Sequence, residues 1–285
     1  MIASTRALSL IEDYSLEMTG KEVAKLADAH ATIPPGTRIN VTFLGNEDLQ
    51  LRLGAARAVA RLGFVPVPHI SARRLASQEQ AEEFLGALAQ SGVSGNVFTV
   101  AGDPSTPEGP YEDALAVIRS GLLERHGVRH VCISGYPEGH PAIDEPTLWA
   151  ALESKVAALR EQGTPGTIIT QFGFDSDAVL TWVEAVRARG IDLPIRIGVP
   201  GPAGVRRLLT YAARFGVGTS VGIAKKYGLS ITNLMGTAGP DRFIRSLGES
   251  YDGARHGELK LHFYPFGGLK ATSEWATEFR RSGRA

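Results

Sequence analysis

Three absences limit what this chain can be. It has one cysteine, Cys132, which excludes an internal disulfide framework and a cysteine-based zinc site and makes a reducing cytoplasm the simplest context. Its 30 basic and 30 acidic residues cancel, so no general field attracts nucleic acid or an anionic membrane. No run of 18 apolar residues occurs, and the N-terminal segment lacks an apolar signal core, so we expect neither a membrane span nor export.

Short apolar segments alternate with helical patterns along the 285 residues. Strands are expected at Tyr14–Thr19, Arg38–Leu44, Phe64–Ile70, Asn96–Gly102, Arg129–Gly135, Gly166–Phe172, Pro194–Pro200 and Leu259–Phe266. Strand–helix alternation predicts a parallel sheet covered by helices. Eight units favour a (β/α)₈ TIM barrel of the α/β class. The alternative, an open dinucleotide-binding sheet, needs a Gly-x-Gly-x-x-Gly turn after its first strand, and none is present.

The clearest helix is expected from Asn46 to Leu62, where Asn46 can cap the first turn and Gly63 follows the last. Other helical patterns fill residues 78–90, 111–126, 145–162, 177–189 and 202–215. Extra helical material, roughly residues 219–256, is inserted before the last strand. Since no linker or low-complexity segment divides the chain, we expect one barrel domain over residues 1–285.

Polar residues recur where the predicted strands end. The strand in GTIITQFGFD, for example, is interrupted by Gln171. The set at the strand ends is Glu17, Thr42, His69, Asp103, Tyr136, Gln171 and Tyr264. Each alone could be a turn former or cap, and His69 could be a core histidine. Because a barrel carries its chemistry at the carboxyl ends of its strands, their convergence favours a polar ring at a barrel mouth.

The motifs around these residues, taken in order, resemble those of the methylenetetrahydrofolate reductase family over nearly the whole chain. They are SLEMT, PVPHIS, AGDPS, GYPEGHP, ITQFGFD and LHFYPF. GYPEGHP and ITQFGFD are the specific ones at this spacing. The resemblance implies a (β/α)₈ barrel that interconverts 5,10-methylenetetrahydrofolate and 5-methyltetrahydrofolate, with FAD carrying the hydride and NAD(P)H as co-substrate.

Residue roles are also implied by the resemblance. Glu17 would be the general acid that opens the folate ring, Asp103 would lie near the pterin and the flavin, and Gln171 would orient folate or nicotinamide. The flavin-contacting positions are Thr42, His69, Gly102, Asp103, Tyr111, Tyr136, His140 and Lys155. Phe172 and Phe266 would contact the substrate. No metal is expected, and a homo-oligomer stays open.

Several positions depart from the family pattern. Ala101 stands where an arginine precedes the Gly-Asp-Pro turn. Leu148, Ala151 and Ser154 stand where polar and basic residues hold the adenosine and diphosphate of FAD. Gly204 replaces a phenylalanine, and FGGLK (Phe266–Lys270) lacks an arginine expected near folate. The interpretation favours FAD but predicts weak or altered binding. Its alternative is direct hydride transfer from NAD(P)H to folate.

More remote functions compete with this interpretation. GTSVG matches Gly-x-Ser-x-Gly around Ser220, with Asp241 and His256 following in hydrolase order, but a helix rather than a strand is expected before it. His126 and His130 have i, i+4 spacing for a metal but lack a third ligand. A non-catalytic folate- or flavin-binding barrel would keep the ligands without needing Glu17.

Overall fold

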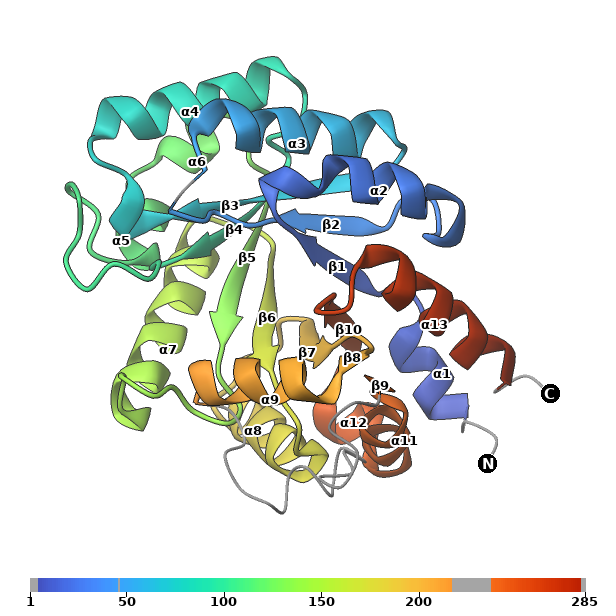
Figure 1. Cartoon of the computed structure of the whole chain (residues 1–285). Coiled ribbons are helices and arrows are strands. Elements are labelled where there is room, and N and C mark those ends of the chain that lie inside the picture. Colours follow the sequence, from blue (N-terminus) through green and yellow to red (C-terminus); the bar gives the residue numbers. More distant parts are fainter. Residues whose placement is uncertain (1–4, 46, 217–236, 283–285) are drawn as a thin grey trace.

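The computed structural model describes residues 5–45, 47–216 and 237–282. Eight parallel strands close into a barrel in the order β1-β10-β7-β6-β5-β4-β3-β2 (Figure 1). They are β1 (Ser15–Met18), β2 (Arg38–Val41), β3 (Val65–Ser71), β4 (Asn96–Val100), β5 (His130–Gly135), β6 (Gly166–Phe172), β7 (Ile195–Pro200) and β10 (Leu259–Tyr264). The predicted (β/α)₈ barrel is confirmed, and each expected strand overlaps an observed one.

Helices surround the barrel, and the terminal helices α1 and α13 lie side by side (Figure 1). The α-helices are α1 (Thr5–Ile11), α2 (Val23–Ala29), α3 (Leu49–Arg61), α4 (Gln78–Gln90), α5 (Ala114–Arg119), α6 (Leu122–Arg125), α7 (Glu145–Glu161), α8 (Ser176–Ala188), α9 (Val205–Arg214), α11 (Asp241–Ser250), α12 (Gly253–His256) and α13 (Leu269–Ser282). Three 3₁₀ turns, η1 (Gly20–Glu22), η2 (His30–Thr32) and η3 (Ala72–Arg74), follow strands or helices, and β8 (Ala203–Gly204) pairs with β9 (Thr237–Ala238).

Three local expectations change. Asp48, not Asn46, caps α3, because its carboxylate accepts from the Leu51 N–H; Asn46 itself lies outside the described residues. The helix expected over 111–126 is two helices, because Gly121 adopts a left-handed conformation (φ +75°) between α5 and α6. The expected insertion falls partly outside the described residues, and its described remainder contains β9, α11 and α12.

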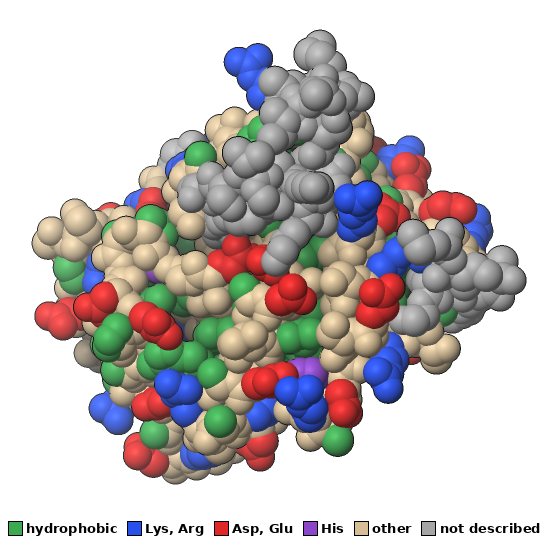
Figure 2. All heavy atoms as spheres, turned by 90° about the horizontal axis from the view of Figure 1, so that it is seen from below, with side chains coloured by type: hydrophobic (Ala, Val, Ile, Leu, Met, Phe, Trp, Pro, Cys, Tyr) green, Lys and Arg blue, Asp and Glu red, His purple; other side chains and the backbone are tan. Residues whose placement is uncertain are grey.

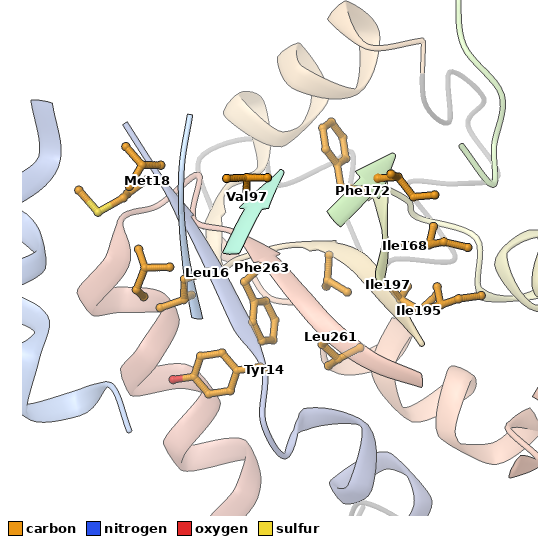
Figure 3. Close-up of a cluster of buried hydrophobic side chains, with 14 of the residues drawn as sticks. Tyr14, Leu16, Met18, Val97, Ile168, Phe172, Ile195, Ile197, Leu261 and Phe263 are labelled. Carbon is orange, nitrogen blue, oxygen red and sulfur yellow. The ribbon is translucent and has the colours of Figure 1, made fainter. Parts of the chain in front are cut away.

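The main hydrophobic core lies between the barrel and its helices. Side chains from the outer face of the strands, among them Leu16 and Phe263 from the neighbouring β1 and β10, are buried there with the Tyr14 ring against Phe263 (Figure 3). Full burial of one such side chain contributes about 1.5–3 kcal/mol. Inside the barrel, the apolar cluster of Val67, Phe98, Cys132 and Ile169 is smaller. The alternation leaves most other inward positions polar.

Charged groups also organise the amino-terminal end of the barrel. Arg196 of β7 is nearly buried and donates to the Asp13 carboxylate at 2.7 Å, and Arg38 of β2 donates to the same carboxylate at 3.0 Å. This end of such barrels serves stability rather than chemistry.

On the face shown in Figure 2, basic and acidic side chains lie interspersed. No helix among the described residues is both long and apolar enough to cross a bilayer.

Candidate active site

Glu17 lies inside the barrel mouth between two histidines. Its carboxylate Oε2 is 3.3 Å from Nε2 of His262 on β10 and 3.8 Å from Nε2 of His69 on β3, and its side chain is 16% exposed. His262 is fully buried, and its Nδ1 is 2.8 Å from the Ser15 hydroxyl. If that hydroxyl donates to Nδ1, the ring proton sits on Nε2 and faces Glu17. Ser15, His262 and Glu17 therefore form one hydrogen-bonded chain.

His69 is held neutral by its burial. Burial lowers the pKa of His69 to about 4, an effect that the Glu17 carboxylate opposes and His262 reinforces. At neutral pH the His69 ring is therefore neutral, and its 3.8 Å approach to Glu17 is a polar contact rather than an ion pair. The ring packs edge-on against Phe98 with centroids 4.7 Å apart, while its buried Nε2 has no hydrogen-bond partner in the described part of the chain.

Gln171 occupies a bulge at the end of β6. The β6–β7 register shifts between Ile169 and Phe172. In β7 a Cβ on Gly198 would overlap the backbone of Thr170 and Gln171, so this glycine makes room for the bulge. The Gln171 Oε1 accepts from the Phe172 N–H at 3.1 Å, and no described residue bonds its amide nitrogen. Gln171 is therefore the extra residue of the bulge, and its amide N–H groups are available to donate to a ligand.

An aromatic wall stands beside Glu17. Phe172 contacts Tyr264 and Phe266 edge-on, with centroids 5.4 and 5.1 Å apart, and Phe266 stacks on Tyr211 of α9 at 4.0 Å. The Tyr264 hydroxyl donates to the Thr170 carbonyl, and burial, together with nearby Glu17 and Tyr136, raises the pKa of Tyr264 well above its usual value. Such a wall suits a flat heteroaromatic ligand.

Two cavities open at this end of the barrel. The mouth cavity, of about 550 Å³, is lined by Glu17, Thr42, Tyr264 and Phe266 and by the cations Lys21, Lys25 and Arg207. The α7 cavity, of about 650 Å³, lies against α7 and is lined by residues that include Tyr136, Leu148, Ala151, Ser154 and Lys155. Of the residues expected to meet folate, Glu17 and Phe266 line the mouth cavity. Of the positions expected to contact flavin, Tyr136 and Lys155 line the α7 cavity, and Thr42 lines the mouth cavity.

Lys155 is a buried amine in the α7 cavity. Its Nζ lies 3.2 Å from the Ser134 hydroxyl, and burial lowers the pKa of Lys155 to about 8, partly offset by Asp113. Tyr136 lines the same cavity, and its pKa is raised by burial. The half-buried His140 ring lies 5.5 Å from Tyr136, and its Nδ1 accepts from the Ala142 N–H.

Three other predicted residues lie elsewhere. Asp103 is 76% exposed and forms an ion pair with Arg74 at 2.6 Å. Gly102 has φ +98°, and a Cβ there would overlap the Ser71 hydroxyl, so glycine is required at this turn. Tyr111 is buried within the main hydrophobic core. In this structure none of the three lines the mouth cavity or the α7 cavity.

Sequence reasoning missed His262 as a partner of Glu17. The residue stands within LHFYPF, but nothing local marks it as functional. The available signal is its spacing: it precedes Tyr264 by two residues and so shares the inward face of β10. The Arg74 partner of Asp103 was missed as well, because it comes from η3, 29 residues earlier.

The residues fit the two halves of FAD unequally. Thr42 Oγ1 and His69 Nε2 are buried without a hydrogen-bond partner among the described residues, so they could bond heteroatoms of a flavin ring. The α7 cavity has two basic lining residues, Arg73 and Lys155, and three acidic ones. The acidic ones are Asp113, Glu138 and Glu145. A doubly charged diphosphate would therefore meet more carboxylates than cations, so this half fits poorly.

The described residues form neither the serine hydrolase site nor the histidine metal site considered as alternatives. His256 Nε2 is 3.1 Å from Glu184, and Asp241 accepts from Trp275, so the two are held by different partners; Ser220 lies outside the described residues. His130 contacts the Thr167 hydroxyl. Within the described ranges no three His, Cys, Asp or Glu side chains are grouped as for a metal ion.

Comparisons with known proteins agree on one family. The family model described as methylenetetrahydrofolate reductase matches residues 20–213, more than half of the chain. Methylenetetrahydrofolate reductase 2 of Saccharomyces cerevisiae is 32% identical over 126 residues, 41% of this chain and 20% of its own. Methylenetetrahydrofolate reductase (NADH) 1 of Arabidopsis thaliana is 30% identical over 135 residues, which cover 43% of this chain and 22% of the plant protein. The 5,10-methylenetetrahydrofolate reductase of Pectobacterium carotovorum subsp. carotovorum is 27% identical over 154 residues, which cover 53% of this chain and 49% of the bacterial protein.

The matches cover only part of each relative. They span about a fifth of the yeast and plant proteins and about half of the bacterial one. Glu17 and His262 lie outside the segment that the family model matches. Among solved structures, dihydropteroate synthase from Thermus thermophilus aligns over 99% of both chains with a TM-score of 0.49 and 15% identity, a likeness too distant to bear on function.

Proposed function

Because this chain belongs to the methylenetetrahydrofolate reductase family, we propose that it interconverts 5,10-methylenetetrahydrofolate and 5-methyltetrahydrofolate with NAD(P)H, in one barrel domain over residues 1–285. The observation that carries the proposal is the Glu17 carboxyl, recessed in an aromatic-walled cavity and bonded to His262. A non-catalytic folate-binding barrel would have no use for an inward-facing acid linked to an imidazole.

Glu17 supplies the proton that the reaction needs. The bridging carbon of the substrate can accept hydride only after the five-membered ring has opened to an iminium cation. Ring opening breaks the bond between that carbon and one nitrogen, and Glu17 protonates the departing nitrogen. His262 Nε2, 3.3 Å away and backed by Ser15, orients the carboxyl and can return a proton to it. Hydride addition to the iminium carbon then gives the methyl group.

Binding and orientation fall to the surrounding side chains. Tyr264 and Phe266 line the mouth cavity and offer faces and edges on which a pterin or nicotinamide ring can pack. Phe172, which is 2% exposed, packs behind them against both rings rather than facing the cavity. The amide nitrogen of Gln171 donates to a ring carbonyl or carboxamide. Asp103 is exposed in this structure and paired with Arg74, so its proposed electrostatic role requires the Gly102–Asp103 turn to approach the ligand.

We keep FAD as the proposed cofactor. Thr42, His69, Tyr136 and Lys155 would hold its ring, and the bound flavin would carry hydride between NAD(P)H and folate. Direct hydride transfer without flavin is the second candidate. It is favoured by the acidic lining of the α7 cavity and by Leu148, Ala151 and Ser154 within it.

One experiment tests the activity and separates the candidates. Purified protein is examined by absorbance, then assayed for folate-dependent NAD(P)H oxidation with and without added FAD. We expect activity that rises with added FAD, since each missing charge-assisted contact costs about 1.5–3 kcal/mol, or one to two decades of affinity. One tightly held FAD per chain would contradict weak binding. Full activity without flavin would replace FAD by direct transfer, and no folate-dependent oxidation at all would refute the proposal.

A further inference from the structure

A second opening adjoins the mouth cavity and is strongly cationic. This arginine groove, of about 830 Å³, lies between the segment after β7 and the segment after β10. Arg206, Arg207 and Arg214 of α9 line one side, and Gly267 lines the other. Its described lining residues include no Asp or Glu. In a chain with 30 acidic and 30 basic residues, three cations without an acid are a local imbalance.

The spacing along α9 places these cations together. Arg206, Thr210 and Arg214 follow at i, i+4 and i+8 and so share one helix face, while Leu208 and Ala212 are buried on another. Neither Arg206 nor Arg214 forms an ion pair with a described residue. Gly204, the residue before the first turn of α9, has no side chain to cap the first backbone N–H groups. Both features leave positive charge unsatisfied at the groove.

The groove is continuous with the site around Glu17. Arg207, Tyr211 and Gly267 line both the arginine groove and the mouth cavity. Arg207 is fixed at this boundary because its Nη1 donates to the Phe266 carbonyl at 2.8 Å. A Cβ on Gly267 would overlap the Pro202 carbonyl, so glycine allows the two segments to meet beside the groove.

We infer that the arginine groove is a subsite for an oxyanion group at the far end of a substrate whose reacting end lies at Glu17. This inference rests on the proposed function. The shared chemistry is a phosphate monoester or carboxylate bound by guanidinium groups. It has two sources in the proposed reaction: the 2′-phosphate of NADPH, or the glutamate carboxylates of a folate. Parallel barrels commonly bind phosphate between the segments after their seventh and eighth strands, which is the location of this groove.

The test compares Arg206→Ala/Arg214→Ala with the matched control Arg61→Ala/Arg119→Ala. The control removes the same charge from exposed positions on α3 and α5. KM is measured for NADPH and NADH, and for methylenetetrahydrofolate with one and with three glutamates. We expect the groove variant to raise KM about tenfold or more for one anionic substrate, with a smaller change for its less charged counterpart. A selective rise for NADPH assigns the phosphate, and one for the triglutamate assigns the carboxylates.

Binding measured without turnover separates this inference from the proposed function. Calorimetry gives the Kd of adenosine 2′,5′-bisphosphate and of tri-γ-glutamate, even if the protein reduces no folate. We expect at least one probe to bind the parent and the control, to bind about tenfold more weakly to the groove variant, and to be partly restored by Arg206→Lys/Arg214→Lys. Circular dichroism verifies folding of each variant. Equal KM and Kd values in parent, control and groove variant, or no binding of either probe to the parent, would overturn the subsite.

Discussion

Replacing Glu17 by glutamine removes the acidic proton that a carboxyl group can transfer and leaves the side chain nearly the same shape. The amide keeps an oxygen that can accept a hydrogen bond from His262 Nε2, which lies 3.3 Å from the carboxylate in the parent protein. It cannot donate a proton of carboxylic acidity to a departing nitrogen. The other carboxylate that lines the mouth cavity, Glu22, is held by the Thr19 N–H at 2.9 Å and by Lys25 at 3.1 Å, so no free acid takes over.

We therefore expect folate-dependent NAD(P)H oxidation by Glu17→Gln to fall about 10²–10⁴-fold. This corresponds to roughly 2.7–5.4 kcal/mol of lost transition-state stabilisation. Reduction of any bound flavin by NAD(P)H should stay near the parental rate, because that half of the reaction needs no proton on folate. The assay follows absorbance of the reduced nicotinamide under anaerobic conditions, with and without folate.

Glu161→Gln, at an exposed position at the end of α7, is the matched control and should behave as the parent. Parental folate turnover by Glu17→Gln would refute the general-acid role. Equal losses in both half-reactions would instead show that the substitution disturbs binding or folding rather than proton transfer.

Two further predictions concern the scaffold of the site. Gly198→Ala forces a Cβ against the β6 bulge, so we expect it to lower the free energy of unfolding by about 1–3 kcal/mol and to reduce folate turnover. The control Gly54→Ala, on the exposed side of α3, should not destabilise the protein. Thermal melts and the oxidation assay check both variants, and a Gly198→Ala protein as stable and active as the parent would contradict the bulge argument. Burial holds the pKa of His69 at about 4 against about 6.5 in an unfolded chain, so the unfolded state binds more protons between these values and stability falls as pH drops from about 6.5 to about 4. The expected loss from pH 7 to pH 4.5 is about 2–3 kcal/mol in urea titrations, and it should shrink in His69→Gln; an unchanged loss in that variant would show that other groups cause it.

The eight strands could be predicted because each is a local pattern. A β-branched run such as Thr167–Thr170, bounded by Gly166, predicts a buried strand without knowledge of its neighbours. The strand ends follow for the same reason, so Glu17 and Gln171 could be assigned to one mouth from sequence.

What could not be predicted depends on residues far apart in the chain. The bulge at Gln171 exists because Gly198, on the next strand, leaves space for it. Glu17 and His262 meet across 245 positions, and no local pattern encodes such a contact. The start of α3 shows the limit at short range as well: Asn46 and Asp48 are equally good caps by residue type, and only the structure shows that Asp48 caps the helix.

The pairing of β1 with β10 has a consequence for synthesis of the protein. These strands form the seam where the barrel closes, and Ser15 lies opposite His262 in their register. The hydrogen-bonded chain of Ser15, His262 and Glu17 therefore crosses the seam. A nascent chain with its first seven barrel strands holds the acid but lacks its imidazole partner. The contact between His262 and Glu17 can form only when β10 has been translated and docked, so the proposed proton transfer requires a completed barrel.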